Sequence, residues 1–388
     1  MRGAASAVAV AAIAACALRP VEVSTAPLVL PFQVDSQRAE VVAAGVVHRF
    51  IHSSTGPWAV HVLDVDRDAC YSAVAVKGFA GAIGRKKTSA MLRELDSAGT
   101  VVGGVNADFF EPNGVPRNAH ISRGRVISGP SDRPVLAFDS LGRPRILILS
   151  IVHFTGSDTL PYRWGWNRVL PQGISVLDSN WGAVTDTASR AIEAVYEPHA
   201  DSLRLARVDT SPGGVAVPRG GRVLVLRGDA ASDRHFHTLV RDRPRLMQAD
   251  PALLPFHPLE AVGGRPMLAR DSSVVAQVDT AGGPDFATRR HPRTAVGIAR
   301  DAKRLLLVTV DGRQKPYSDG MTLRELANLM LALGARDAIN LDGGGSTAMV
   351  VKAPATGTLA LVNAPSDSAG ERAVGNALAI VKGCTAAR

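Results

Sequence analysis

Three aspartates, Asp108, Asp311 and Asp342, each follow closely on an apolar, strand-like run of residues. A pair of carboxylates can activate water and stabilise or protonate the groups of a bond being broken. The same oxygen atoms could instead hold Mg²⁺ or Ca²⁺. The residues alone leave both chemistries open, and they leave open which carboxylate would be the base and which would stabilise charge.

The most specific motif follows Asp342 and reads Gly343-Gly344-Gly345-Ser346-Thr347. Three consecutive glycines cost chain entropy and allow a close approach of the backbone to a ligand. The N–H groups of such a loop, together with the two hydroxyls, could bind a phosphate or another oxyanion. A flexible turn with a capping hydroxyl is the alternative. The loop is not a Walker motif, because no Gly-Lys-Ser/Thr follows the required spacing.

Further polar residues near these segments could bind substrate. Arg293 and Arg313 carry the fork that grips phosphate, although Arg313 could also pair with a turn carboxylate. His291 is a candidate acid or base, or a structural hydrogen-bonding residue. The other candidates for substrate binding are Asn106, Glu371 and Arg372, of which the last two could also form a structural ion pair; the family resemblance described below adds Ser318.

The elements that would position these residues are best defined between 304 and 342. The run 305–310 predicts a buried strand, and Thr322 and Glu325 have capping-box spacing before a helical apolar pattern that ends at Gly334. A second short strand, 338–341, leads to Asp342. If both strands share one sheet, they run parallel, and Asp311 and Asp342 lie at the same sheet edge, where ligands commonly bind.

The rest of the chain predicts many short strands separated by Gly and Pro. The segments 41–50, 101–105, 135–138, 203–208 and 222–227 are examples, and 88–95 predicts a short helix with Thr88 as its N-cap. We therefore expect an α/β (mixed α+β) fold: one large domain with a mixed sheet, the parallel strand–helix–strand unit at 304–342 and several antiparallel strands.

The N-terminal residues 1–18 resemble an export signal, with Arg2 before an apolar run that is too short to span a bilayer. The run ends at Cys16, which is typical of a lipoprotein signal with a lipid anchor but also fits an ordinary secretory signal. Residues 19–40 are predicted to be a linker, and 41–388 the catalytic domain. No other segment is apolar and long enough to cross a membrane.

Charge and cysteine content exclude several classes of protein. The formal net charge is +9, which favours anionic partners. The basic residues are spread along the chain and do not form clusters, which argues against nucleic-acid binding. No Cys/His cluster has zinc-site spacing, while Cys70 and Cys384 could form a disulfide or remain thiols. The chain also lacks a Gly-x-Ser-x-Gly elbow and a Rossmann glycine fingerprint.

Several motifs, in the same order, resemble the phosphodiester glycosidase family. They are 103–110 (GGVNADFF), 261–266 (AVGGRP), 293–297 (RTAVG), 310–313 (VDGR), 318–323 (SDGMTL), 340–347 (NLDGGGST) and 371–372 (ER). The cluster from 293 to 347 is highly specific. Residues 153–260 match poorly, and we expect substrate-specific variation there.

The resemblance implies a hydrolase that cleaves the glycosidic bond of a sugar-1-phosphodiester, as the family's named member does with N-acetylglucosamine. It implies no cofactor, with a divalent cation still possible, and a phosphorylated glycan as the partner. The protein would be exported to the periplasm, cell surface or medium and touch a membrane only through Cys16. A metal-dependent phosphodiesterase and a non-catalytic glycan-binding protein are the alternatives.

Overall fold

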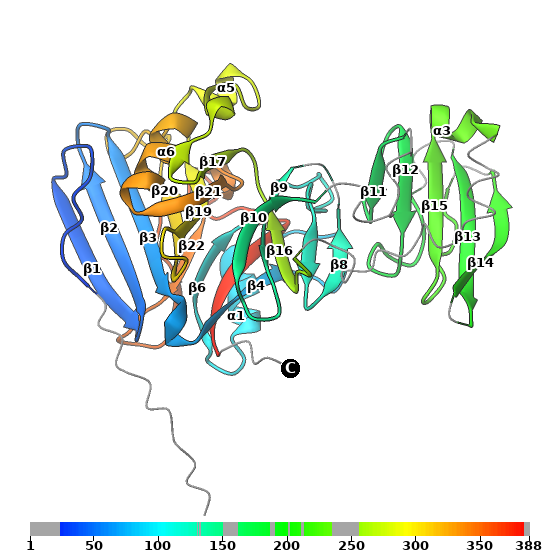
Figure 1. Ribbon diagram of the computed structural model, residues 1–388, viewed down its shortest axis with the longest axis horizontal. Coiled ribbons are helices and arrows are strands. Elements are labelled where there is room, and N and C mark those ends of the chain that lie inside the picture. Colours follow the sequence, from blue (N-terminus) through cyan, green and yellow to red (C-terminus); the bar gives the residue numbers. More distant parts are fainter. Residues whose placement is uncertain are drawn as a thin grey trace, which may run out of the picture.

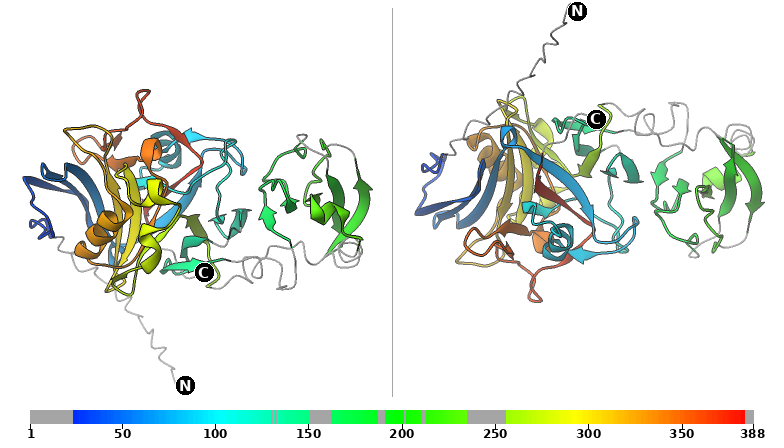
Figure 2. Two further views of the ribbon diagram at one scale, coloured as in Figure 1. Left: turned by 90° about the horizontal axis from the view of Figure 1, so that it is seen from above. Right: turned by 90° about the horizontal axis from the view of Figure 1, so that it is seen from below.

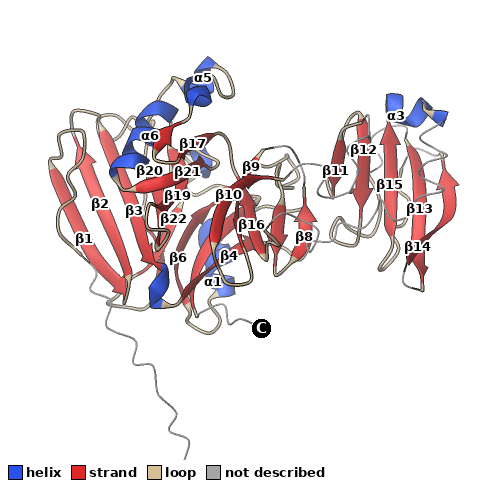
Figure 3. Cartoon of the chain, in the orientation of Figure 1, coloured by secondary structure: helices blue, strands red, loops and turns tan. Residues whose placement is uncertain are grey.

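The structure is a computed structural model and describes residues 24–129, 131, 133–149, 162–186, 191–200, 202–210, 213–234 and 256–383. Strands dominate it, and its helices are short (Figure 3). The α-helices are α1 (Thr88–Leu95), α3 (Asp229–Ser232), α5 (Pro284–Ala287) and α6 (Leu323–Ala332). Among these described residues no helix is long and apolar enough to cross a membrane.

The largest sheet lies at one end of the molecule (Figure 1). Its strands, in spatial order, are β1 (Ser36–Ala43), β2 (Val46–Ser53), β3 (Trp58–Asp66), β20 (Arg304–Val310), β19 (Arg293–Ala299), β21 (Ala335–Asn340), β17 (Met267–Arg270) and β18 (Ser273–Val274). Every strand pairs with its neighbours in the antiparallel sense.

This pairing corrects the expected α/β class. Strands β20 and β21 do run in the same direction, and α6 connects them, but β19 lies between them and is antiparallel to both. The two strands are therefore not a parallel pair, and the fold is mostly antiparallel β. The helix itself is confirmed: Thr322 accepts from the Glu325 N–H at 3.1 Å and Glu325 from the Thr322 N–H at 2.9 Å.

A second sheet packs against one face of the first. It contains β23 (Leu359–Leu361), β22 (Met349–Lys352), β6 (Val101–Asn106), β25 (Asn376–Lys382) and β4 (Tyr71–Lys77). Leu63 and Leu307 from the first sheet meet Val105 and Leu378 from the second in one buried core. The other face of the first sheet is covered by α6, because Leu306 and Val308 alternate with Leu307 and point toward that helix. Burial on both faces explains why 305–310 is apolar at every position except the buried Thr309.

Two further sheets extend the molecule to one side (Figures 1 and 2). One contains β10 (Pro144–Ile148), β9 (Pro134–Phe138), β16 (Glu260–Gly263), β7 (His120–Ser122) and β8 (Arg125–Ser128). The other contains β11 (Trp164–Trp166), β12 (Gly173–Leu177), β15 (Arg222–Arg227), β13 (Ile192–His199) and β14 (Ser202–Asp209). The outer sheet forms a projecting lobe that shares a core with the inner one. A short ladder joins β24 (Ala373–Val374) to β5 (Lys86–Lys87).

Some local predictions need correction. The segment 41–50 is not one strand, because Gly45 adopts a φ of 77° in the turn between β1 and β2. Residues 36–40, predicted to be linker, belong to β1. Leu28 and Phe32, from the same predicted linker, pack on the core between the first sheet and α6. Lys87, not Thr88, is the N-cap of α1. The predicted signal at 1–18, with Cys16, lies outside the described residues.

Candidate active site

Asp108 and Asp342 come together where β6 of the second sheet and β21 of the first sheet end. The Asp342 N–H donates to the Ala107 carbonyl at 2.8 Å, and Asn106 Nδ2 donates to the Asp342 carbonyl at 2.6 Å. Asn106 Oδ1 in turn accepts from Thr294 Oγ1 at 2.8 Å and the Ala348 N–H at 3.0 Å. The buried Asn106 amide is thus used to join the two sheets, so it positions Asp342.

The Asp108 carboxylate is buried, with a relative exposure of 1%. It accepts from the Asn118 N–H at 2.7 Å and from Asn118 Nδ2 at 3.0 Å. Gly263 closes the other side, because a Cβ there would lie 2.6 Å from Asp108 Oδ2. Burial raises the pKa of Asp108 to about 7; the Asn118 N–H and the Arg133 charge oppose this, and the nearby Asp342 charge adds to it.

Asp342 is the more accessible member of this pair, because part of the residue reaches solvent. Its carboxyl still lies among protein atoms, and this burial raises its pKa to about 6 against the influence of Ser346, the Gly343 N–H and Arg372. The Gly343 N–H donates to Asp342 Oδ1 at 3.0 Å. Two neighbouring carboxyls with raised pKa values hold one proton between them near neutral pH.

Arg117, Arg133 and Arg168 lie within electrostatic range of the aspartate pair, and Arg265 lies within range of Arg133; the first three lie in no motif that the sequence singled out. Arg117 and Arg168 each lie 3.3 Å from Glu111 Oε1. Arg133 and Arg265 make no side-chain hydrogen bond or ion pair with a described residue, yet both lie within electrostatic range of this cluster. Unpaired guanidinium groups beside carboxylates suit an anionic ligand. Only Arg265, within the motif 261–266, was near a sequence signal.

Aromatic rings border the same region. Phe109, directly after Asp108, meets Phe286 edge-on with ring centroids 5.9 Å apart. The guanidinium of Arg265 lies 6.0 Å from the Phe286 ring and that of Arg293 lies 5.2 Å from it. Such rings can pack against the apolar face of a sugar while the arginines hold its anionic part.

The glycine loop forms a short 3₁₀ turn, Gly344–Ser346, and already uses most of its N–H groups. The Gly344 N–H donates to the Pro292 carbonyl at 2.9 Å, and the Ser346 and Thr347 N–H groups donate within the loop. The hydroxyls of Ser346 and Thr347 are buried and make no hydrogen bond of standard geometry with protein. A Cβ on Gly345 would meet Arg372 Nη2 at 2.2 Å. The loop is therefore a tightly packed support for Asp342.

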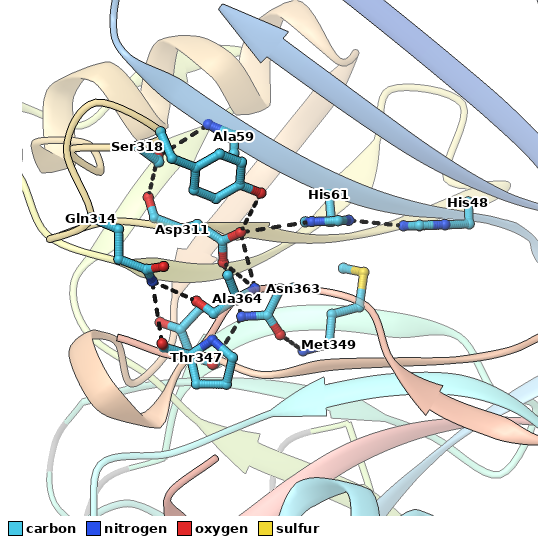
Figure 4. Close-up of polar contacts among 12 residues, drawn as sticks. His48, Ala59, His61, Asp311, Gln314, Ser318, Thr347, Met349, Asn363 and Ala364 are labelled. Carbon is cyan, nitrogen blue, oxygen red and sulfur yellow. Dashed lines mark hydrogen bonds and ion pairs between the residues drawn. The ribbon is translucent and has the colours of Figure 1, made fainter. Parts of the chain in front are cut away.

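Asp311 belongs to a polar network of its own with Asn363, Ala364 and Tyr317 (Figure 4). Because β19 separates β20 from β21, the two strand ends are about 10 Å apart at the usual strand spacing. The Asp311 carboxylate accepts from Asn363 Nδ2 at 3.0 Å, the Ala364 N–H at 3.1 Å and Tyr317 at 3.1 Å. Burial raises its pKa, and these three donors lower it. Asn363 also donates to the Thr347 carbonyl, which links Asp311 to the loop.

This network predicts a structural role that stability measurements can test. Asp311→Ala should lower the free energy of unfolding by about 3 kcal/mol, because it leaves buried donors without an acceptor. Tyr317→Phe removes only one of these bonds and should cost about 1 kcal/mol. Urea unfolding of both variants measures the difference. Equal, near-zero effects would contradict the structural role of Asp311.

The two arginines predicted to clamp phosphate differ in availability. Arg293 is buried, and its guanidinium donates to the carbonyls of Met321 at 2.8 Å and Phe286 at 2.7 Å, so it braces the loop before β19. Arg313 is exposed, has a φ of 60° and lies against Gly344. Its Nη2 is 3.1 Å from His291 Nδ1. Arg313 is therefore the more accessible of the two cations.

The remaining predicted binding residues have other partners. Glu371 accepts from the Ser89 N–H at 2.8 Å at the start of α1, and Arg372 pairs with Asp367 at 2.7 Å, so the two do not pair with each other. Arg372 faces Gly345 and lowers the pKa of Asp342. Ser318 donates to the Asp311 carbonyl at 2.6 Å and accepts from the Ala59 N–H, which is a structural arrangement.

Comparison with known proteins decides the family. The sequence profile of the phosphodiester glycosidase family matches residues 186–381, just over half of the chain. The chain belongs to this family. The profile spans the glycine loop, Asp311 and Arg265, whereas Asp108 and Arg133 precede it. No curated protein matches the chain.

Two solved structures of low sequence identity share the fold of this family member, and a third resembles it more weakly. A hypothetical protein from Synechocystis has a TM-score of 0.68 at 20% identity, covering 89% of this chain and 64% of that one. A candidate exported protein from Burkholderia pseudomallei has a TM-score of 0.60 at 23% identity, covering 84% and 74%. The zebrafish N-acetylglucosamine-1-phosphodiester alpha-N-acetylglucosaminidase catalytic domain has a TM-score of 0.47 at 15% identity, covering 92% and 84%. This chain thus spans less than two thirds of the Synechocystis protein.

The geometry also bears on the metal-assisted alternative. That mechanism requires Asp108, Asp311 and Asp342 to converge, but Asp311 belongs to its own network. Within the described ranges no group of three or more His, Cys, Asp or Glu side chains could hold a metal ion.

Cys70 is disulfide-bonded, and Cys384 lies outside the described residues.

Proposed function

We propose that this chain is an exported hydrolase that cleaves the glycosidic bond of a sugar-1-phosphodiester and releases the free sugar and a phosphomonoester. The observation that carries the proposal is the Asp108–Asp342 pair near Arg133 and Arg265, which have no hydrogen-bond or ion-pair partner among the described residues, in a member of the phosphodiester glycosidase family. A phosphodiester is already a good leaving group, so stabilising its charge matters more than strong acid assistance.

The two aspartates take different roles in this proposal. Asp342 is accessible, so its carboxylate activates water or stabilises the positively charged sugar of the transition state. Asp108 is buried and stays protonated until about pH 7, because burial and the Asp342 charge raise its pKa, and Asn118 holds it in place beside Asp342. Asp311 has no place in the reaction. Arg133, Arg265 and Arg313 bind the phosphodiester, and Phe109 packs on the sugar.

The carboxyl pair predicts a narrow pH optimum. Activity should rise through an apparent pKa of about 6 as Asp342 ionises and fall above about 7 as the pair gains a second negative charge that repels the anionic substrate. The pH dependence of kcat/KM measures both limbs. A flat profile between roughly pH 5 and 8 would contradict the role of the pair.

The function itself is tested by incubating the purified mature domain with a panel of sugar-1-phosphodiesters, with and without EDTA. We expect free sugar and a phosphomonoester to form in both conditions. Release of a sugar-1-phosphate, or loss of turnover with EDTA, would instead favour a metal-dependent phosphodiesterase. Export is inferred from residues 1–18 and is consistent with the naming of the Burkholderia neighbour; fractionation of cells expressing the full chain tests it.

A further inference from the structure

A polar pocket lies over strands β1, β2 and β3 of the first sheet, close to Asp311. It has a volume of about 360 Å³, and its lining includes Arg38, Glu40, His48, Phe50, His61 and Tyr317. Neighbouring strands place Arg38 opposite Phe50, and Phe50 opposite His61. The polar lining therefore continues the core-facing side of the sheet.

Two histidines, His48 and His61, form a row of polar side chains that leads from this pocket to Asp311. His48 Nε2 lies 3.1 Å from His61 Nδ1, and His61 Nε2 lies 3.8 Å from Asp311 Oδ2; Figure 4 shows the three side chains in a row. His61 is only 5% exposed, and its Nε2 has no hydrogen-bond partner among the residues that the structure describes. A proton on His61 Nε2 faces the carboxylate favourably, so His61 Nδ1 accepts from His48 Nε2. This tautomer leaves His48 Nδ1 as an acceptor.

The pocket also offers flat, uncharged surfaces. The Phe50 and His61 rings are 4.9 Å apart, and Tyr317 is 36% exposed while its hydroxyl donates to Asp311. Burial lowers the pKa of His48 to about 4 and that of His61 to about 3, so both rings are neutral at neutral pH. Arg38 and Glu40 carry opposite charges. This lining lacks the excess positive charge that a phosphate would need.

We propose that this pocket is a separate binding site for a neutral hexopyranose. A sugar ring packs its C–H face on Phe50 and Tyr317, while vicinal hydroxyls bond to His48 and to the planar ends of Arg38 and Glu40. The pocket lies over β1–β3, and Asp108 and Asp342 do not line it. The proposal does not rest on the proposed hydrolysis, because it concerns binding alone.

Saturation-transfer NMR with methyl α-glucopyranoside, N-acetylglucosamine and inorganic phosphate tests this site on the full mature chain. We expect at least one sugar to bind with a Kd in the roughly millimolar range. His48→Phe keeps a ring of similar size and should weaken that binding at least about tenfold. His199→Phe, the same change at an exposed position at the end of β13, should leave it unchanged. Asp342→Asn should also leave it unchanged.

Three results would overturn the proposal. The first is that neither sugar binds. The second is that phosphate displaces the sugar from the wild-type chain. The third is that Asp342→Asn abolishes sugar binding while His48→Phe does not, which would place the sugar at the aspartate pair. If His48→Phe does not fold, Arg38→Ala carries the test, because Arg38 is exposed on β1 and its loss should weaken binding several-fold. None of these experiments measures turnover, so a negative result for sugar binding is distinct from a negative result for the proposed hydrolysis.

Discussion

Asp342→Asn should lower kcat for a sugar-1-phosphodiester by about 10²–10⁴-fold while the protein stays folded. The amide has the shape of the carboxylate, and its oxygen can still accept from the Gly343 N–H, which lies 3.0 Å from Oδ1. It cannot take a proton from water or stabilise a developing positive charge. Steady-state kinetics, with circular dichroism to verify folding, measure the effect.

A matched control separates this loss from a general effect of removing an acid. Asp301→Asn changes an exposed aspartate in the turn between β19 and β20, at the other end of these strands from Asp342. We expect this variant to keep wild-type kcat. Full activity in Asp342→Asn would show that the reaction does not use this carboxylate.

Asp108 should make the protein less stable as the pH rises from about 4 to about 7. Its folded pKa of about 7 is above the ordinary value of 3.8, so the folded state binds the proton more tightly than the unfolded state. The associated stability is fully present below the ordinary value and is lost as pH rises through the folded one. Because the carboxyl is buried, the loss is on the order of 4 kcal/mol.

Comparison with Asp108→Asn isolates this contribution. Buried histidines, including His61 and His120, have lowered pKa values and change stability in the opposite direction, but they titrate in both proteins. The difference in free energy of unfolding between wild type and variant, measured with urea from roughly pH 4 to 8, should therefore change by several kcal/mol. Parallel curves for the two proteins would contradict the raised pKa.

Local parts of this architecture could be predicted because their signals are local. The capping box at Thr322 and Glu325 and the apolar run ending at Val310 define α6 and β20 without knowledge of the rest of the fold. The same patterns place Asp108 and Asp342 directly after strands. The alternation of apolar residues does not say which strands become neighbours.

Long-range strand pairing and burial could not be predicted from the sequence. Insertion of β19 between β20 and β21 moves Asp311 away from Asp342, and nothing in 304–342 encodes that insertion. Arg293 has the sequence context of a phosphate clamp, yet its guanidinium donates hydrogen bonds to the loop carbonyls of Phe286 and Met321. Arg133 has no periodic or motif signal, since only the folded chain brings it to Asp108.

The most direct test of the account is hydrolysis of a sugar-1-phosphodiester in H₂¹⁸O by the mature domain, with mass spectrometry of both products. We expect ¹⁸O to enter the sugar, EDTA not to prevent this, and Asp342→Asn to slow it by about 10²–10⁴-fold. Appearance of ¹⁸O in the phosphate would mean that the P–O bond is cleaved, and would contradict glycosidic hydrolysis by the aspartate pair.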